Sequence, residues 1–441
     1  MTPESITNRR VLGVAVPILL ANITVPILGA VDTGVVGQLG LAAPIGAVGL
    51  GAIVLTSIYW VFGFLRMGTS GLTAQAYGAG DQSEVSALLL RGLLIGGTAG
   101  LFFIIIQWPL IALTFEVTPA SDEVEALARS YMEIRIWGAP ATIASFAISG
   151  WLIALERTRA VLIIQLWVNG LNIALDLWFV LGFGWGVEGV AYATLAAEWT
   201  GVLLGLYLCR DALTLSPWRD RALIFARKRL KTMASVNSDI MIRSVLLEIG
   251  FAYFMFKSAA MGDLTLAANQ ILIQFFYITA YALDGFAFAA EALVGQAMGA
   301  KARGALRRSA ILTSQWGLTC VAALSLGFWF GGDILINIMT TAPDVRALAP
   351  DFLFWVAIAP ILGLPAFMLD GIFIGATRTR DMRNGMLIST PMLLVAAMVL
   401  TPLWGNHGLW IAMLIFFGAR GVTLGLRYRA LENAAQPAPS Y

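Results

Sequence analysis

The sequence predicts an all-α integral membrane protein with twelve transmembrane helices, arranged as two six-helix lobes that repeat each other in the same orientation. Three observations lead to this fold class. Of the 441 residues, 59% are hydrophobic and only 12% are charged, whereas a soluble domain carries about 25% charged residues. The apolar residues fall in long runs, and the two halves of the chain resemble each other at a constant spacing. So few charges cannot cover a water-soluble surface, so the surplus apolar surface must face lipid.

Composition also excludes several classes of protein. Cys209 and Cys320 are isolated, with no CxxC spacing, so they form neither a metal site nor a disulfide framework. His407 is the single histidine, which excludes a histidine-based metal cluster, and the net charge of +2 argues against a nucleic-acid partner. We therefore expect no enzyme activity, no cofactor and no nucleic-acid partner.

The apolar runs set the positions of the expected helices, because a spanning helix needs roughly 20 apolar residues. The first run follows MTPESITNRR and continues through Gly37, which is too long for the apolar core of a signal peptide, so we expect a retained first helix. The expected turn between the first two spans lies in the glycine-rich stretch 34–51. The expected spans are 11–37, 45–66, 87–113, 131–155, 160–183, 187–209, 236–258, 265–293, 306–331, 350–375, 385–403 and 407–427.

The distribution of basic residues predicts the topology. If the N-terminus is cytoplasmic, most of the 28 Lys and Arg residues fall in cytoplasmic segments, and the outside loops hold only Arg129, Lys257 and Arg346. Basic residues concentrate on the cytoplasmic side of membrane proteins. We therefore expect a multi-pass protein of the bacterial cytoplasmic (inner) membrane with both termini cytoplasmic.

A basic stretch divides the chain into two sets of six helices. The expected organisation is an N-lobe at 1–209, a cytoplasmic basic linker at 210–235, a C-lobe at 236–430 and a cytoplasmic tail at 431–441. The simplest interpretation of the linker charges is a tether beside anionic lipid headgroups.

An internal repeat with an offset of 221 residues relates the two lobes. AQAYGAGD at 74–81 matches GQAMGAKA at 295–302, and GWLIALERTR at 150–159 matches GIFIGATRTR at 371–380. Six helices per repeat place both copies in the same orientation, which is typical of transporters whose halves are related by an axis along the membrane normal. Two such lobes can open a cleft to alternate sides by rocking.

Ionisable residues inside the spans are the candidate functional residues, because each is unfavourable by about 2.5–3.5 kcal/mol in the bilayer and tends to be functional. Asp32 lies late in the first helix, after Pro17 and Pro26. Proline removes a backbone hydrogen bond and kinks a helix, so we expect Pro17 and Pro26 to let this helix change its bend when the carboxylate changes charge.

A second carboxylate lies in the motif NGLNIALD at 169–176. Asn169, Asn172 and Asp176 recur at i, i+3 and i+7 and share one helix face. Thr194 on the next helix completes an oxygen-rich pocket in this prediction. A buried carboxyl pair can exchange protons, and a set of carboxylate and carbonyl oxygens can instead hold a hard cation such as Na+. Spacing alone does not choose between H+ and Na+ at Asp32 and Asp176.

Other intramembrane charges have a second interpretation as structural ion pairs. Arg66, Arg243, Glu291 and Glu198 lie near span ends, where pairing is as good an explanation as function. In the second half, Glu248, Asp284 and Asp370 remain candidates for additional coupling or substrate contact. Acids outnumber bases within the spans, which favours cationic substrates.

Several motifs resemble the multidrug and toxic compound extrusion (MATE) transporters, and most of all their DinF-type prokaryotic branch. The resemblance runs through nearly the whole chain, and the motifs come in the family's order. They are ANITVPILGAVDTGVVGQLG at 21–40, GLTAQAYGAGD at 71–81, NGLNIALD at 169–176, AYALDGFAFAAEALVGQAMGA at 280–300 and LDGIFIGATRTRDMRN at 369–384.

This resemblance implies a monomeric secondary active transporter that exports cationic or amphipathic drugs, driven by H+ or Na+. It implies an N-lobe cation site on Asp32, Asn172, Asp176 and Thr194, in which protonation of Asp32 bends the first helix. In the NorM-type branch, acids on the seventh and tenth helices matter, and Glu248 and Asp370 fall at comparable places. We expect proton coupling, with Na+ coupling as the alternative.

Two further classes of protein compete with this interpretation. A flippase for lipids or lipid-linked precursors also has two lobes, but we would expect a more basic cleft to hold phosphates. A membrane-embedded enzyme would need a nucleophile and base or a metal arrangement, which the sequence does not show.

Overall fold

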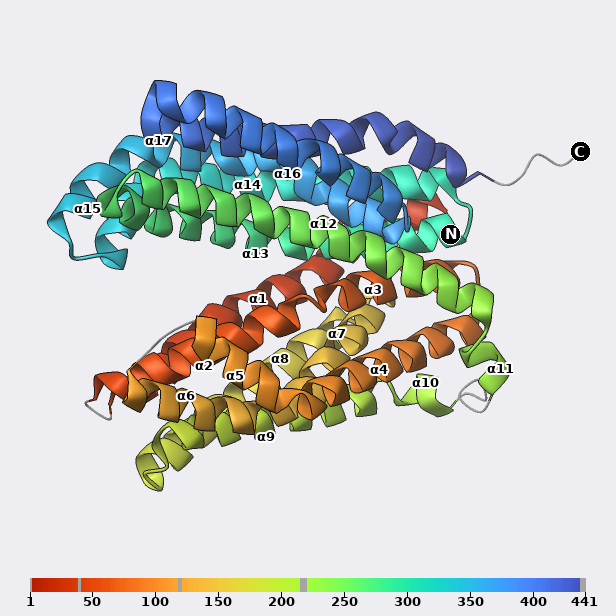
Figure 1. Ribbon diagram of the computed structural model, residues 1–441. Helices are drawn as coiled ribbons and strands as arrows, with labels where there is room; N and C mark the ends of the chain where they lie inside the picture. Colours follow the sequence, from red (N-terminus) through yellow and green to blue (C-terminus); the bar gives the residue numbers. More distant parts are fainter. Residues whose placement is uncertain (1, 39–40, 118–120, 215–219, 437–441) are drawn as a thin grey trace, which may run out of the picture. The chain divides into compact units, whose positions relative to one another are not determined.

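The computed structural model describes residues 2–38, 41–117, 121–214 and 220–436. Within these ranges the chain folds almost entirely into helices (Figure 1), so the all-α prediction is confirmed. The expected linker at 210–235 is described except for 215–219, and the expected tail at 431–441 except for 437–441, which lie outside the described residues.

The helices of the first half follow the expected order, and three begin with a capping side chain. Thr7 Oγ1 accepts a hydrogen bond from Arg10 N at 3.2 Å. Asp81 accepts a hydrogen bond from Glu84 N at 3.0 Å, and Ser121 accepts one from Val124 N at 3.4 Å, which satisfies N–H groups that a helix end leaves free. Three expected spans are divided, because 45–66 falls on α2 and α3, 87–113 on α4 and α5, and 131–155 on α6 and α7. The elements are η1 (Pro3–Ser5), α1 (Asn8–Gly37), α2 (Ala42–Trp60), α3 (Gly63–Gly78), α4 (Gln82–Ile105), α5 (Gln107–Val117), α6 (Asp122–Arg135), η2 (Ile136–Gly138), α7 (Ala139–Ala154), α8 (Thr158–Asp176), η3 (Leu177–Gly182) and α9 (Gly186–Leu208).

The basic segment between the halves docks onto the start of α4. Arg91 is 2% exposed; its Nε donates to the carbonyl of Ile224 at 2.8 Å and its Nη1 to Glu84 Oε1 at 2.7 Å. Arg229 forms ion pairs with Asp81, at 3.3 Å, and with Glu84. Arg229, one of the charges of the expected linker, therefore pairs with acids of the protein, besides any contact with lipid.

The second half contains fewer and longer helices. The longest, α17, is divided at Gly405, whose φ of 56° and ψ of −135° interrupt the helix. A positive φ favours glycine because it has no Cβ. The elements are α10 (Arg210–Thr214), α11 (Arg221–Ile224), α12 (Arg227–Ala260), α13 (Asp263–Gly299), α14 (Arg303–Met339), α15 (Pro343–Leu348), η5 (Ala349–Phe352), α16 (Leu353–Gly375) and α17 (Thr379–Ala434).

The described residues provide twelve membrane-spanning segments. Ten helical stretches are long and apolar enough to cross a membrane. α12 is long enough but carries Asp239, Arg243 and Glu248 in its middle, which lower its hydropathy. The break at Gly405 divides the last stretch into two helices. Adding α12 and counting the last stretch as two raises the number of spanning segments from ten to twelve.

The internal repeat is visible in the backbone. The stretches Ala42–Gly78 and Asp122–Ala154 recur as Asp263–Gly299 and Pro343–Gly375, each with the same length and an offset of 221 residues. Positive φ angles recur at the same offset, in the pairs Gly80 and Lys301, Glu156 and Thr377, and Gly184 and Gly405.

A close helix crossing is also repeated. A Cβ on Gly150 would lie 2.2 Å from the carbonyl oxygen of Arg66, and a Cβ on Gly371 would lie 2.4 Å from that of Ala287. Both distances are far below a normal contact, so only glycine allows these helices to approach so closely. The repeat therefore extends from sequence motifs to helix packing.

The chain forms two compact units, which we describe separately. One contains 20–73 and 81–231, and the other contains 1–19, 74–80 and 232–441. This division differs from the expected lobes at 1–19 and 74–80. The reason for the first difference is local packing, since Gly285 on α13 lies against Ala15 and Leu19 of α1. We call the first unit the N-lobe unit and the second the C-lobe unit.

Candidate functional site

Four predicted residues from three helices meet in the N-lobe unit. Asp32 lies on α1, Asn172 and Asp176 on α8, and Thr194 on α9. The Asn172 amide has one orientation that gives both of its polar atoms partners. In it, the amide nitrogen donates to Asp32 Oδ1 at 3.0 Å and to Asp176 Oδ2 at 3.2 Å, and the amide oxygen accepts from Thr194 N at 3.2 Å and Thr194 Oγ1 at 3.0 Å. Asn172 thus connects both carboxyl groups to α9.

The polar face of α8 continues beyond these four residues. Asn169 donates to Thr24 Oγ1 of α1 at 2.7 Å and accepts from Gln165 at 3.0 Å. Asn172 and Asp176 are fully buried, and Asn169 is 4% exposed. The three polar residues at i, i+3 and i+7 therefore face the protein interior, as their spacing predicts, and all three lie against side chains of α1.

Asp176 lies where α8 changes its helical form. The helix continues as η3, a π-helix over Leu177–Gly182, in which Phe183 N donates to Trp178 O at 3.0 Å. Such wider turns are frequent at functional sites. Four aromatic rings contact one another just beyond Asp176, namely those of Trp178, Phe179, Phe183 and Trp185.

The two carboxyl groups form a single site. Asp32 and Asp176 lie within hydrogen-bonding reach of each other, and Asp176 Oδ1 is buried without a hydrogen-bond partner. Two carboxylates so close together cannot both stay ionised in a water-poor interior. The site must therefore contain a proton or a cation. Among the described residues, no group of three or more His, Cys, Asp or Glu side chains is arranged to bind a metal.

An ion pair lies beside this site. Arg135 at the end of α6 donates from Nη1 to Glu198 Oε2 at 2.7 Å and from Nη2 to Glu198 Oε1 at 2.9 Å. The ion-pair interpretation of Glu198 is therefore confirmed. Arg135 was not among the predicted site residues. An arginine at the edge of one span, with an acid within another span, was the sequence signal that could have identified it.

The acids of the second half have different surroundings. Asp370 on α16 accepts from both Arg243 of α12 and, at 2.6 Å, Arg420 of α17. Glu248 is exposed on α12, and Asp284 is half-buried on α13. The ion-pair interpretation of Arg243 is also confirmed, and Asp370 is occupied by two guanidinium groups.

Arg420 is stabilised by aromatic rings as well as by Asp370. Its guanidinium carbon lies 5.9, 5.6 and 5.2 Å from the ring centroids of Phe367, Phe416 and Phe417. Aromatic faces attract cations at such distances. The C-lobe charges therefore belong to a packed structural cluster.

Pro17 and Pro26 both lie within α1, and neither ends the helix, which continues from Asn8 to Gly37. The boundary between the two units falls between them, at residues 19 and 20. A helix that begins in one unit and carries Asp32 in the other fits the expected bending role, which stays a prediction.

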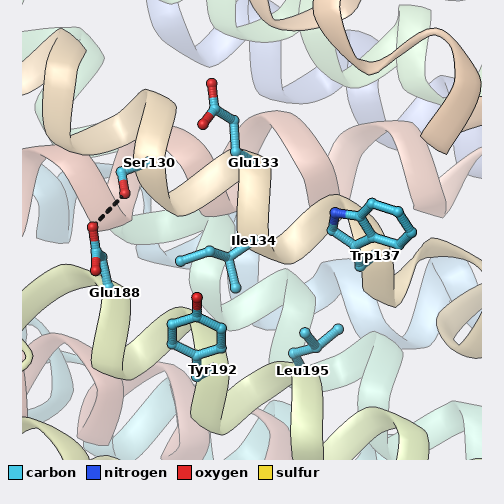
Figure 2. A pocket seen from close by; sticks show the side chains of 7 residues that line it. All are labelled: Ser130, Glu133, Ile134, Trp137, Glu188, Tyr192 and Leu195. Carbon is cyan, nitrogen blue, oxygen red and sulfur yellow. Dashed lines mark hydrogen bonds between the residues drawn. The ribbon is translucent and has the colours of Figure 1, made fainter.

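A separate pocket of about 420 Å³ opens on α6 and α9. It is lined by Ser130, Glu133, Ile134, Trp137, Glu188, Tyr192 and Leu195. Figure 2 shows these side chains, with Ser130 donating to Glu188. None of the four predicted site residues lines this pocket.

The long apolar helices, the repeated halves and the buried carboxyl pair define a multi-pass membrane transporter. A family model described as MatE matches residues 17–178 and again residues 240–401, which is most of the chain in two copies. The protein belongs to the MatE family, and the predicted resemblance is confirmed.

Curated relatives support this assignment. The chain is 37% identical over 94% of its length to the DNA damage-inducible protein F of Escherichia coli, of which it covers 90%. It is 27% identical over 60% of its length to a probable multidrug resistance protein NorM of Neisseria meningitidis, of which it covers 58%. The DinF-type branch is therefore the better match.

A solved structure supports the fold. The structure was reported as an outward-facing conformation of a multidrug resistance MATE family transporter of the MOP superfamily. It matches with a TM-score of 0.86 and 20% identity, covering 97% of this chain and 96% of that one. The twelve-helix transporter fold is therefore confirmed, and the protein belongs to a family of transporters, not of enzymes.

Proposed function

We propose that this protein is a secondary active exporter of cationic or amphipathic small molecules, exchanging them for H+ by alternating access in the bacterial cytoplasmic membrane. In this proposal the N- and C-lobes rock against each other and open a cleft to alternate sides of the membrane. Both termini are cytoplasmic, and the protein works as a monomer. The coupling residues are Asp32, Asn172, Asp176 and Thr194.

One observation carries the choice of H+ over Na+. In the amide orientation that gives both polar atoms of Asn172 partners, its nitrogen donates to both carboxyl groups. A hydrogen-bond donor then occupies the position in which a bound Na+ would require oxygen ligands. A proton shared between Asp32 and Asp176 needs no further ligand. Binding of Na+ would require the Asn172 amide to turn over, so that its oxygen faces the carboxyl groups and its nitrogen donates to Thr194 Oγ1 at 3.0 Å.

The energetics fit such an exchange. One monovalent drug cation exchanged for one proton moves no net charge, so only the pH gradient drives it. Each pH unit then supplies about 1.4 kcal/mol, a tenfold gradient. If two protons enter per drug cation, the membrane potential adds about 2.3 kcal/mol per 100 mV.

The test is ethidium efflux from proteoliposomes under a pH gradient without sodium, and then under a sodium gradient without a pH gradient. We expect transport on the pH gradient alone, and its loss in Asp32→Asn. Asp351→Asn is the matched control, since Asp351 is an exposed aspartate on η5 and the change should leave transport intact.

The other outcomes favour the alternatives. Transport only with sodium would replace H+ by Na+ at the same site. Absence of efflux under either gradient, with movement of a labelled lipid, would favour a flippase.

A further inference from the structure

The ion pair of Arg135 and Glu198 is buried in the N-lobe unit without an assigned role. Arg135 is 8% exposed, and both guanidinium contacts to Glu198 are shorter than 3 Å. Such pairs are expensive to bury, and apolar residues of similar size are often as stable. The position of this pair is therefore informative.

The packing around the pair fixes its geometry. A Cβ on Gly138 would lie 2.4 Å from Glu198 Oε2 and 3.2 Å from Arg135 Nη1, so the bare glycine leaves room for both groups. Tyr131 on α6 lies close to Arg135. Arg135 Nε remains buried without a hydrogen-bond partner, so its hydrogen-bonding capacity is not used up by Glu198.

The pair lies beside the aspartates. Glu198 follows Thr194 by one helical turn on α9, and Thr194 contacts Asn172, which donates to both carboxyl groups. Arg135 acts electrostatically on both Asp32 and Asp176. The other ionisable groups facing this cluster are Tyr59 on α2 and Tyr131 on α6.

The position of the Arg135–Glu198 pair beside the aspartates affects the net charge of the cluster. With both aspartates protonated, the cluster of Asp32, Asp176, Arg135 and Glu198 is neutral, because Arg135 and Glu198 cancel. Each proton that leaves adds one negative charge in a water-poor interior, where charges interact strongly. Arg135 always carries its positive charge, so it is the nearby group that compensates this negative charge.

We propose that Arg135 and Glu198 are positioning residues that set the pH range of coupling: Arg135 compensates the aspartate pair when it releases a proton, and Glu198 limits this compensation. The inference rests on the proposed H+ exchange and assigns its regulation to two residues outside the predicted site. Neither residue touches the transported molecule in this account.

A pair that only stabilises the lobe predicts a different result from a pair that tunes charge. Loss of a structural contact lowers activity at all pH values alike. Loss of one charge moves the pH at which transport is half-maximal, and the direction depends on the sign of the charge removed. The midpoint on the substrate side is therefore the informative measurement.

The experiment uses the full-length protein in proteoliposomes, with initial ethidium exchange measured against pH at constant pH difference. In Arg135→Met the pair releases its proton less readily, so the midpoint should rise by about one pH unit. In Glu198→Gln the guanidinium acts without its partner, so the midpoint should fall by a similar amount. The double variant, which removes both charges, should return close to the wild-type midpoint.

Arg135→Lys separates charge from geometry, because it keeps the positive charge and loses the bidentate contact. We expect its midpoint to stay within a few tenths of a pH unit of wild type, even if its rate falls. Shifts of the same sign in both single variants, or an unchanged midpoint in folded Arg135→Met and Glu198→Gln, would overturn the proposal. If Arg135→Met does not fold, Glu198→Gln and Arg135→Lys still decide the question.

The outcome is distinguishable from failure of the proposed function. A wild-type protein without any pH-driven exchange contradicts H+ coupling and, with it, this inference. A wild-type protein with a clear midpoint that the variants do not move in opposite directions contradicts only the role of Arg135 and Glu198.

Discussion

The two lobes have the same backbone plan but opposite chemistry at equivalent positions. At the offset of 221 residues, Asp32, Asn172, Asp176 and Thr194 correspond to Tyr253, Leu393, Ala397 and Ile415. Leu393 and Ala397 are fully buried in the apolar core of the C-lobe unit. The place that holds the polar site in one lobe is therefore packed with hydrocarbon in the other.

The charged cluster of the C-lobe shows the reverse difference. Arg243, Asp370 and Arg420 correspond to the neutral residues Asn22, Ser149 and Trp199. Helix packing thus follows from the repeat, whereas each buried polar cluster is particular to one lobe. In the proposed function, coupling therefore belongs to the N-lobe and the C-lobe charges are structural.

The largest expected effect comes from giving the N-lobe the residues of the C-lobe. Asp176→Ala and Asn172→Leu introduce the C-lobe residues at 397 and 393. Each should reduce pH-driven efflux by more than about 100-fold, because the shared proton site is lost. Thermal melting in detergent should remain within a few degrees of wild type. If either variant kept pH-driven efflux, the proposal that only the N-lobe holds the coupling site would be contradicted.

The next effect tests the structural role of the C-lobe cluster. Asp370→Asn leaves Arg243 and Arg420 without their common carboxylate, and breaking a buried ion pair costs about 3–5 kcal/mol. We expect a marked fall in melting temperature, with an unchanged pH dependence in the protein that remains folded. A stable variant that no longer couples transport to protons would move a coupling role into the C-lobe.

The repeated glycine crossing should respond alike in the two lobes. Gly150→Val and Gly371→Val each force side-chain atoms into a backbone carbonyl, and we expect each to destabilise its lobe by about 1–3 kcal/mol through overpacking. Comparison of the two melting temperatures measures the effect. A change tolerated in one lobe only would show that the helix packing is less symmetric than the backbone.

The smallest effect concerns the exposed pair of Arg157 and Asp211, joined by a 3.0 Å contact from Arg157 Nη1 to Asp211 Oδ1. The hydrogen bond from Arg157 lowers the pKa of Asp211 below its ordinary value. Because the pKa of Asp211 is lower in the folded state than in the unfolded state, the ionised carboxylate stabilises the folded protein at pH values above the unfolded pKa, near pH 4. This stabilisation is lost as the pH falls through the lowered pKa of the folded state. Because the pair is exposed, Asp211→Asn should change stability at pH 7 by less than about 0.5 kcal/mol. A larger loss in chemical denaturation would contradict this.

The sequence was sufficient for the fold class and the repeat. Apolar run length and charge bias are properties of composition, and the i, i+3, i+7 spacing fixes one helix face for Asn169, Asn172 and Asp176. That Asp32 joins them in one site was implied by the family resemblance. The function of these residues in coupling stays a prediction.

Other features depended on how helices cross, which no local pattern determines. The partner of Arg135 lies on α9, more than sixty residues away, and Asp370 binds arginines from two other helices. The π-helix after Asp176 and the grouping of residues 1–19 with the C-lobe unit also depend on tertiary packing.

Proton release on substrate binding tests the central claim most directly. Purified protein in weakly buffered detergent solution is mixed with ethidium near the transport midpoint, and the released protons are measured with a pH indicator. The account predicts about one proton per bound ethidium for wild type, and none for Asp32→Asn or Asp176→Asn, with binding retained. Binding without proton release by wild type, or equal release by wild type and both variants, would contradict an N-lobe proton site.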